Sequence, residues 1–165
     1  MKLSTRVIVM SGILAAMAIT LKFLSFTTLE YRFTFYDIPL MISGIVFGPF
    51  IGGIVGFITD WIYATTQGWP IGLFTLSSIM GGLIPGLAFM IFKNVNIKTI
   101  TVTVLVTSIL CFSMNTFALY QFQGAGVLGM LVPRIITMVI KWPIEVIMLN
   151  EVYKRVIVQF NIKRA

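Results

Sequence analysis

The sequence predicts an all-α integral membrane protein in which residues 1–165 form one bundle of six transmembrane helices. Hydrophobic residues make up 58% of the chain and its mean hydropathy is +1.01, which is more apolar surface than a soluble domain of this size can bury. The apolar residues gather in runs of roughly 15–25 residues, close to the length that a bilayer requires. Because no long polar linker separates these runs, a single domain is expected.

Hydrophobic runs and helix breakers place the six helices at residues 5–25, 37–49, 51–66, 71–92, 99–120 and 134–158. The first run begins with basic residues and contains small ones, as a secretory signal does, but further spans follow and we expect an uncleaved helix. The second and third helices are predicted to be short. Gly48-Pro49 breaks the chain between them, and Gly52 and Gly56 favour a tightly packed helical hairpin.

The distribution of basic residues predicts the orientation of the bundle. Cytoplasmic loops are enriched in lysine and arginine, so the side with more of them is expected to be cytoplasmic, together with both termini. That side holds Lys2, Arg6, Lys93, Lys98, Lys154, Arg155, Lys163 and Arg164, whereas Lys22, Arg32, Arg134 and Lys141 lie on the other. This topology accounts for the net charge of +7, and with no basic stripe in the sequence we expect no nucleic-acid partner.

Several absences restrict the chemistry of the chain. There is no histidine, so imidazole-based acid–base catalysis is excluded. Cys111 is the single cysteine and can form neither an intrachain disulfide nor a thiolate metal site. No phosphate-binding loop occurs, so ATP is not hydrolysed by that route. We therefore expect no cofactor, no metal and no enzymatic activity.

Charged residues inside or beside apolar segments are the strongest indication of function. Arg32, Asp60, Arg134 and Lys141 all fall on the predicted non-cytoplasmic half. A charge at the bilayer centre costs about 2.5–3.5 kcal/mol on insertion scales, so such residues normally face a protein interior or a water-filled cavity. The four residues predict a polar pocket within the bundle.

The predicted outer loop at residues 27–39 contains aromatic and acidic side chains around one arginine. Tyr31 and Phe33 offer faces on which a flat ring can stack, and Arg32 offers a bidentate donor for a carboxylate. The loop is thus a candidate lid or binding edge. The alternative is an aromatic belt at the membrane interface, with Arg32 bound to Glu30 or to lipid headgroups.

Asp60 follows an apolar stretch and is succeeded by Trp61 and Tyr63. A carboxylate beside aromatic rings can accept two parallel hydrogen bonds from the edge of a pterin-like ring. The alternative is a structural ion pair between Asp60 and either Arg134 or Lys141.

The last predicted helix presents one polar face. Arg134, Met138, Lys141 and Glu145 are spaced by four, three and four residues, which places them on the same side. Glu145 can pair with Lys141 one turn earlier. Arg134 has no partner so close in sequence and is the better candidate for binding an anionic ligand.

Uncharged polar and small residues add two further expectations. Asn115 is a candidate ligand contact because an amide both donates and accepts, whereas the hydroxyls of Thr75, Ser77 and Ser78 could equally bond neighbouring helices. In the first helix, Ser11/Ala15 and Gly12/Ala16 each form a small-xxx-small pair that allows another helix to approach closely.

Together these residues resemble a known family over nearly the whole chain. The resemblance is carried by Gly12 to Ala18, by Arg32-Phe33-Thr34-Phe35 before Ile38-Pro39, by Gly44 to Pro49 with Gly52, Gly56 and Asp60, by Gly72 to Ser77 with Gly82 to Gly86, by Asn115, and by Pro133 to Ile136 with Lys141 and Pro143. The chain resembles the substrate-binding S components of energy-coupling factor (ECF) vitamin transporters, most closely their folate branch. Tyr36-Asp37-Ile38-Pro39 is also similar to the riboflavin and pyrimidine-precursor branches.

The resemblance implies a six-helix S-component fold in a bacterial cell membrane, with a vitamin pocket near the outer face closed by the loops after the first, third and fifth helices. It implies that folate binds tightly and that its rings lie among the aromatic residues Tyr31, Phe33, Trp61, Tyr63, Trp69 and Phe74. The polar residues Asp60, Thr75 and Asn115 would be nearby. The carboxylates of folate would lie near Arg32, Arg134 or Lys141. It also implies that Gly12, Ala15 and Ala16 dock on a transmembrane coupling subunit bound to two cytoplasmic ATPases, and that the loaded subunit topples in the membrane to deliver its ligand inward.

Two alternatives remain open at this level. One is an S component for riboflavin or a thiamin-precursor pyrimidine. The other is a self-sufficient small channel or ion-coupled carrier, in which Asp60, Lys141 and Glu145 would line a permeation path.

Overall fold

A computed structural model describes residues 5–27, 32–92 and 96–158. The bundle that these residues form is built almost wholly of helices. The elements in chain order are α1 (Thr5–Phe23), β1 (Phe26–Thr27), β2 (Arg32–Phe33), α2 (Asp37–Phe47), α3 (Pro49–Gln67), α4 (Leu73–Ile91), α5 (Ile97–Gln123), the 3₁₀ helix η1 (Gly124–Met130), α6 (Leu131–Val152) and the π-helical turn η2 (Tyr153–Val158).

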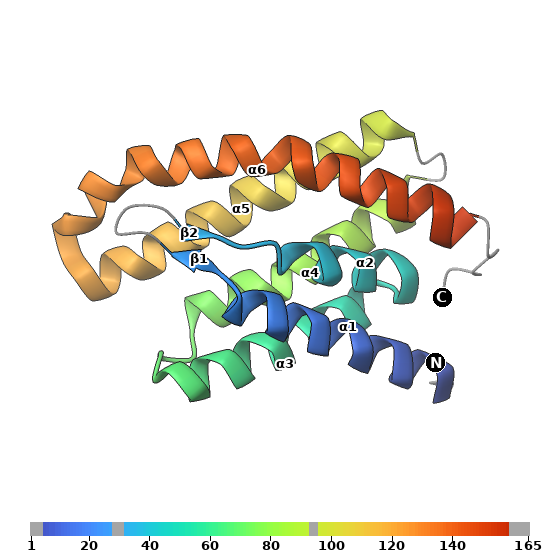
Figure 1. The fold of residues 1–165 in the computed structure, drawn as a ribbon, viewed down its shortest axis with the longest axis horizontal. Coiled ribbons are helices and arrows are strands. Elements are labelled where there is room, and N and C mark those ends of the chain that lie inside the picture. The colour runs from blue at the N-terminus through green and yellow to red at the C-terminus, as the bar shows by residue number, and fades with distance from the viewer. Residues whose placement is uncertain (1–4, 28–31, 93–95, 159–165) are drawn as a thin grey trace.

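The helices form two groups. In the first, α4 packs on α2 and α3, and α1 packs on the same two helices. In the second, α5, η1 and α6 make one long bent arm in which α6 runs back along α5, as Figure 1 shows. The arm is joined to the first group through α4 on one side and through α2 and β2 on the other.

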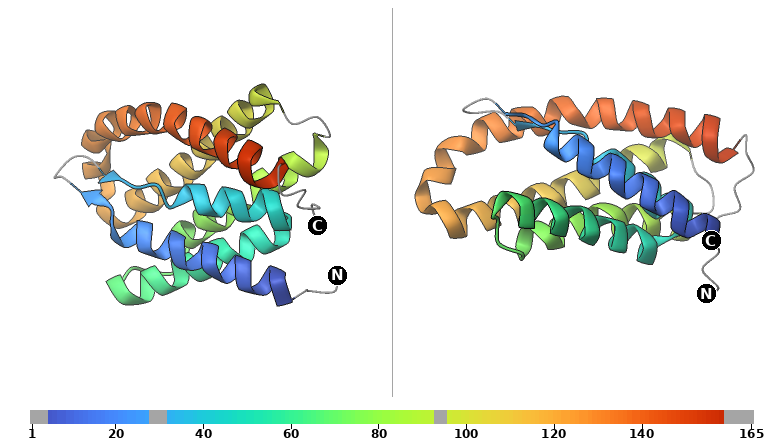
Figure 2. Two further views of the ribbon diagram at one scale, coloured as in Figure 1. Left: turned by 45° about the vertical axis from the view of Figure 1, so that its right-hand side comes forward. Right: turned by 60° about the horizontal axis from the view of Figure 1, so that its bottom comes forward.

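The bundle has two ends, and different connections between the helices lie at each. The antiparallel β1–β2 pair, the α3–α4 connection and η1 lie at one end, which is on the left in Figure 1. The start of α1, the α2–α3 turn and the end of α6 lie at the other, and both views in Figure 2 preserve this arrangement. The predicted up-and-down passage of the chain is therefore seen in the described residues.

The predicted helix positions agree with the structure, with three differences. The prediction of a short second helix is confirmed, because α2 has 11 residues, but α3 has 19 residues and is as long as α1 and α4. The break between α2 and α3 is a single residue, Gly48, whose φ of +91° disfavours any residue with a side chain. The stretch after residue 120, predicted as a loop, continues as helix through η1.

Glycines bring the backbones of α2, α3 and α4 into direct contact. A Cβ atom added to Gly44 would overlap the carbonyl oxygen of Gly82, and one added to Gly56 would overlap the carbonyl oxygen of Ser78. Small residues allow such close packing where lipid supplies no hydrophobic driving force between helices. The hairpin predicted from the glycine pattern thus becomes a three-helix contact that includes α4.

The surface is apolar and suited to lipid. Large hydrophobic side chains such as Ile8, Ile13, Phe50, Met90 and Ile147 are exposed, while the core holds Leu40, Met41, Val104 and Leu149. Within the described ranges, three helical stretches are long and apolar enough to cross a membrane: Thr5–Phe23, Leu73–Ile91 and the continuous Ile97–Arg155. The chain is a multi-pass membrane protein.

Candidate ligand-binding cavity

A cavity of about 430 Å³ opens at the end of the bundle that carries the β1–β2 pair and η1. Its size lies within the range typical of small-molecule sites. Both helix groups line it. The polar and aromatic lining residues are Lys22, Thr34, Tyr36, Asp37, Asp60, Tyr63, Trp69, Phe74, Ser78, Thr107, Ser108, Cys111, Phe112, Asn115, Gln123, Arg134, Thr137, Lys141 and Glu145.

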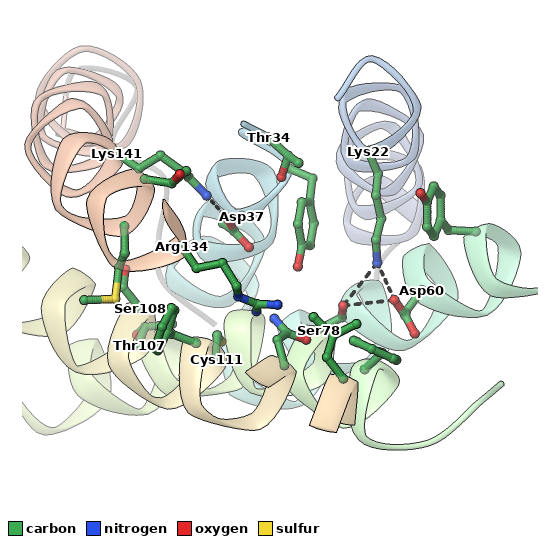
Figure 3. A pocket seen from close by; sticks show the side chains of 18 of the residues that line it. Lys22, Thr34, Asp37, Asp60, Ser78, Thr107, Ser108, Cys111, Arg134 and Lys141 are labelled. Carbon is green, nitrogen blue, oxygen red and sulfur yellow. Dashed lines mark hydrogen bonds and ion pairs between the residues drawn. The ribbon is translucent and has the colours of Figure 1, made fainter. Parts of the chain in front are cut away.

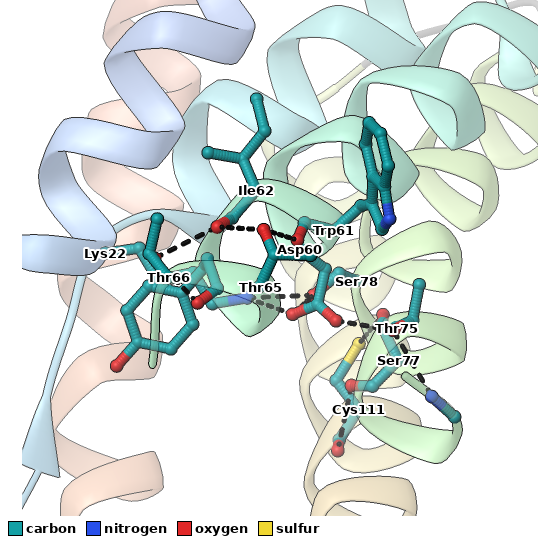
Figure 4. Close-up of polar contacts among 12 residues, drawn as sticks. Lys22, Asp60, Trp61, Ile62, Thr65, Thr66, Thr75, Ser77, Ser78 and Cys111 are labelled. Atoms are coloured by element: carbon teal, nitrogen blue, oxygen red, sulfur yellow. Dashed lines mark hydrogen bonds and ion pairs between the residues drawn. The ribbon is translucent and has the colours of Figure 1, made fainter. Parts of the chain in front are cut away.

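One side of the cavity is organised around an ion pair between Lys22 and Asp60. Lys22 is in the last turn of α1 and Asp60 is in α3, and both are buried. Thr75 donates a hydrogen bond of 2.6 Å to the second carboxylate oxygen of Asp60, and Ser78 donates one of 3.3 Å to the first (Figure 4). The carboxylate is thus held by α1 and α4 together.

The ammonium group of Lys22 also faces aromatic rings. Its Nζ lies 4.6 Å from the ring centroid of Tyr36 and 5.0 Å from that of Tyr63. Both distances are within the range of a cation–π interaction. The two rings thus add favourable contacts to the ammonium group that pairs with Asp60.

The opposite side of the cavity contains a second charged cluster centred on Lys141 of α6. Its Nζ lies 2.7 Å from a carboxylate oxygen of Asp37, at the start of α2, and 3.1 Å from one of Glu145. Ser108 of α5 donates a hydrogen bond of 3.4 Å to the other oxygen of Glu145. Lys141 therefore links α6 to α2 across 104 positions of sequence.

Arg134 lies between these two clusters. Figure 3 shows its guanidinium pointing into the middle of the cavity, with Lys141 and Asp37 on one side and Lys22 and Asp60 on the other. The guanidinium carbon lies 5.6 Å from the ring centroid of Phe112. A planar guanidinium in this position can receive a carboxylate through two parallel hydrogen bonds.

Aromatic side chains supply part of the apolar lining, together with aliphatic residues such as Met41, Leu119 and Met138. Trp69, in the α3–α4 connection, meets the ring of Phe74 edge-on with centroids 5.7 Å apart, and Phe74 stacks on Phe122 at 6.2 Å. Tyr63 contributes a further ring from α3. The site combines flat apolar faces with fixed charges, as sites for ring-containing anions require.

The structure brings together most of the residues predicted for the site. Asp60, Tyr63, Trp69, Phe74, Asn115, Arg134 and Lys141 all line the cavity. Thr75 lies behind the lining and bonds Asp60. The shared face predicted for α6 is confirmed, because Arg134, Met138, Lys141 and Glu145 all line the cavity, and the Lys141–Glu145 ion pair is confirmed as well.

Other predicted residues lie elsewhere. Trp61 is 48% exposed and stacks on Phe57 outside the cavity, because it follows Asp60 by 100° around α3 and so points away. Phe33 is half-buried in β2 and does not line the cavity. Tyr31 lies outside the described residues, and only the backbone of Arg32 is described.

Two corrections concern charge partners. The structural alternative for Asp60, an ion pair with Arg134 or Lys141, names the wrong partner, since Asp60 pairs with Lys22. Asp37 begins α2, at the residue where the second helix is predicted to start, and it pairs with Lys141, a partner that the sequence did not indicate. The sequence did carry a signal for Lys22, because a lysine on the side with few basic residues is an exception to the charge bias and needs a partner.

The small residues of α1 divide between two environments. Gly12 and Ala16 are exposed, and a Cβ added to Gly12 would meet nothing within 4 Å. Ala15 is buried against the bundle and is therefore not available to the docking face that was predicted to include it. Ser11 and Ala15 lie on a different side of α1 from Gly12 and Ala16. One exposed small-residue pair, Gly12/Ala16, remains on the surface.

Within the part of the chain that the structure describes, no three Cys, Asp or Glu side chains come together in a group that could hold a metal ion. The thiol of Cys111 lies 3.4 Å from the carbonyl oxygen of Ser77. It packs at the α4–α5 contact on the cavity wall.

Comparisons with known proteins agree on one family. A family model described as "ECF transporter, substrate-specific component" matches residues 6–158. The folate transporter FolT of Clostridium novyi (strain NT) is 33% identical over 138 residues, which cover 82% of this chain and 80% of that protein. These matches extend over the helices that line the cavity.

Two solved structures share the fold. A crystal structure of FolT bound with folic acid matches with a TM-score of 0.81 at 24% identity, covering 93% of this chain and 96% of that one. A structure of the S component of a bacterial ECF transporter matches with a TM-score of 0.69 at 22% identity, covering 96% and 98%. The family is a transport component and not an enzyme, and it replaces the alternative of a self-sufficient channel or carrier. The chain belongs to the substrate-specific components of ECF transporters.

Proposed function

We propose that this S component binds folate tightly in the cavity between its two helix groups. The observation that carries the proposal is the position of Arg134, whose guanidinium points into the cavity between two lysine–carboxylate clusters. The relative from Clostridium novyi is a folate transporter, and the solved structure with a TM-score of 0.81 is of a protein bound with folic acid. Both support the same ligand.

The chemistry of the lining fits the parts of folate. The pterin and aminobenzoate groups are flat rings that can pack among Tyr63, Trp69 and Phe74. The glutamate part carries carboxylates, which a bidentate guanidinium such as Arg134 recognises well. The amide of Asn115 offers a donor and an acceptor for ring-edge groups.

The lining carries equal numbers of cationic and acidic residues. Three cationic residues, Lys22, Arg134 and Lys141, face three acidic ones, Asp37, Asp60 and Glu145. Lys22 is held by Asp60, and Lys141 is held by both other carboxylates. Both lysines therefore take part in internal ion pairs, and the guanidinium of Arg134 adds a third cationic group between them.

Equilibrium binding to the detergent-purified chain tests this assignment. Folate is compared with riboflavin and a thiamin-precursor pyrimidine, and Arg134→Ala is compared with Arg155→Ala. Arg155 is an exposed residue at the far end, paired with Glu151. We expect folate to be selected and Arg134→Ala to weaken its binding roughly 10- to 150-fold, as for loss of a hydrogen-bonded charge, with Arg155→Ala unchanged. Preference for either comparator would overturn the ligand and leave the family intact.

The orientation follows from charge and from the position of the cavity. Among described residues, Arg6, Lys98, Lys154 and Arg155 lie at the end opposite the cavity, so the bias of basic residues supports a cytoplasmic location for that end and for both termini. The cavity then faces outward, where the vitamin is captured.

Release inside the cell requires partners, because the sequence contains no ATP-binding loop. The proposed partners are a transmembrane coupling subunit and two cytoplasmic ATPases, the arrangement implied by the family. The exposed pair Gly12/Ala16 on α1 is the proposed docking face, since small residues permit close approach of another helix. Toppling of the docked, loaded subunit would carry the cavity from the outer to the inner side.

A further inference from the structure

A second hollow lies at the opposite end of the bundle from the cavity, between the start of α5 and the end of α6. Its polar lining consists of Asn96, Lys98, Asn150, Tyr153 and Lys154, above an apolar floor formed by Ile100. None of the described residues that line it is acidic. The hollow is therefore cationic as well as polar.

Asn150 contributes a largely buried amide to the hollow. Its side chain is only 9% exposed on α6, it lines the hollow, and no hydrogen bond joins that side chain to another described residue. The amide lines the hollow, so its N–H groups are open to a bound acceptor. An acceptor in the hollow would satisfy its N–H groups.

The start of α5 adds donors to the same hollow. The first N–H groups of a helix have no helical partner, and the Asn96 side chain does not cap them. The helix has 27 residues, so the positive end of its dipole is well developed and favours an anion. Lys98 and Lys154 place two ammonium groups at the rim.

We propose that this hollow binds the phosphate group of an anionic membrane phospholipid. Basic hollows between transmembrane helices are suited to such headgroups. Exposed apolar residues beside the hollow, Ile97 on its rim and Val102 farther along α5, offer a path for the acyl chains. A soluble phosphate would make the polar contacts but would leave this apolar path unused.

Native mass spectrometry of the purified full chain tests the proposal, with phosphatidylglycerol and phosphatidylcholine supplied in equal amounts. We expect one phosphatidylglycerol to be retained by the unmodified chain. Lys98→Gln/Lys154→Gln should weaken retention roughly thirtyfold. The charge-matched control, Arg6→Gln/Arg155→Gln, removes two cations from the same end but outside the hollow and should leave retention unchanged.

Asn150→Leu tests the buried amide without changing charge. It should weaken phosphatidylglycerol retention about fivefold, the effect of losing one hydrogen bond, and thermal unfolding of each variant verifies that it is folded. Since the lysine pair is exposed, its variant tests the site even if Asn150→Leu does not fold.

Three outcomes would overturn the proposal. Equal retention by the lysine-pair variant would show that the hollow does not bind the lipid. An equal loss in the charge-matched control would show a general effect of surface charge. Displacement of the lipid by millimolar inorganic phosphate would show that the site takes soluble phosphate instead.

Discussion

Lys22 and Asp60 form a buried ion pair that ties the last turn of α1 to α3, although 38 positions separate them in the sequence. The pair also forms part of the cavity wall. The same contact therefore serves the stability of the bundle and the shape of the site.

Replacing Lys22 with Met should destabilise the protein by about 3–5 kcal/mol, because the carboxylate of Asp60 would remain buried without its main counter-charge. Thermal unfolding in detergent measures this, and Lys22→Met/Asp60→Leu should recover part of the loss. Arg155→Met breaks an exposed pair with Glu151 and should cost less than about 1 kcal/mol. Equal effects of the two single changes would contradict the burial of the Lys22 pair.

The Lys141 cluster should respond unequally to loss of its members. Lys141→Met leaves the carboxylates of Asp37 and Glu145 facing one another without a cation, whereas Glu145→Gln preserves the Lys141–Asp37 pair. We expect the first change to lower the unfolding temperature more than the second. A larger loss for Glu145→Gln would mean that Glu145, and not Asp37, is the main partner of Lys141.

Substitutions of the two tryptophans near Asp60 should have different effects on the affinity for folate. Trp69 lines the cavity, so Trp69→Ala should weaken folate binding roughly three- to tenfold through loss of ring packing. Trp61 lies on the outer surface with Phe57, and Trp61→Ala should leave the affinity unchanged. Quenching of intrinsic fluorescence is unsuitable here because it changes with each tryptophan, so calorimetry is the appropriate readout.

Glycine substitutions should distinguish close helix contact from open space. Gly44→Ala places a methyl group against the Gly82 backbone, which cannot move aside as a side chain can, and should destabilise the protein by about 1–3 kcal/mol or more. Gly126→Ala is the control, because a Cβ there meets nothing within 4 Å. Comparable thermal unfolding of the two variants would refute the tight packing of α2 on α4.

The docking face should be separable from ligand binding. Ala16→Trp fills the exposed small-residue surface of α1 and should stop folate uptake by cells that contain the coupling subunits, while the purified variant still binds folate. Ile147→Trp adds similar bulk to an exposed position of α6 and should permit uptake. Normal uptake by Ala16→Trp would indicate that another surface makes the contact.

Much of the fold follows from the sequence because hydrophobic runs and Gly-Pro breaks are local signals. The face of α6 was predictable for the same reason, since the spacing of Arg134, Lys141 and Glu145 depends only on helix geometry. The polar pocket was predictable from the energetic cost of charges in lipid. These inferences need no knowledge of how the helices pack.

The pairing of charged residues depends on how the helices pack, so it could not be predicted from local sequence signals. Sequence spacing cannot show that α1 crosses α3 where Lys22 meets Asp60, or that the start of α2 brings Asp37 to Lys141. Trp61 lies outside the cavity for a different reason, because successive helical residues are rotated by 100° and the residue after Asp60 therefore points to the outer surface. Ala15 points into the bundle for a similar reason, because the pairs Ser11/Ala15 and Gly12/Ala16 are offset by one residue and so lie on different faces of α1.

The glycine contacts make α2, α3 and α4 the most closely packed group of helices described above. Where Gly44 meets Gly82 and Gly56 meets Ser78, the backbones leave no slack for α2, α3 and α4 to slide past one another. In η1, by contrast, a Cβ atom added to Gly126 or Gly129 would meet nothing within 4 Å. We therefore expect that substitutions in η1 can change the size of the ligand that the cavity accepts, while α2, α3 and α4 keep their packing.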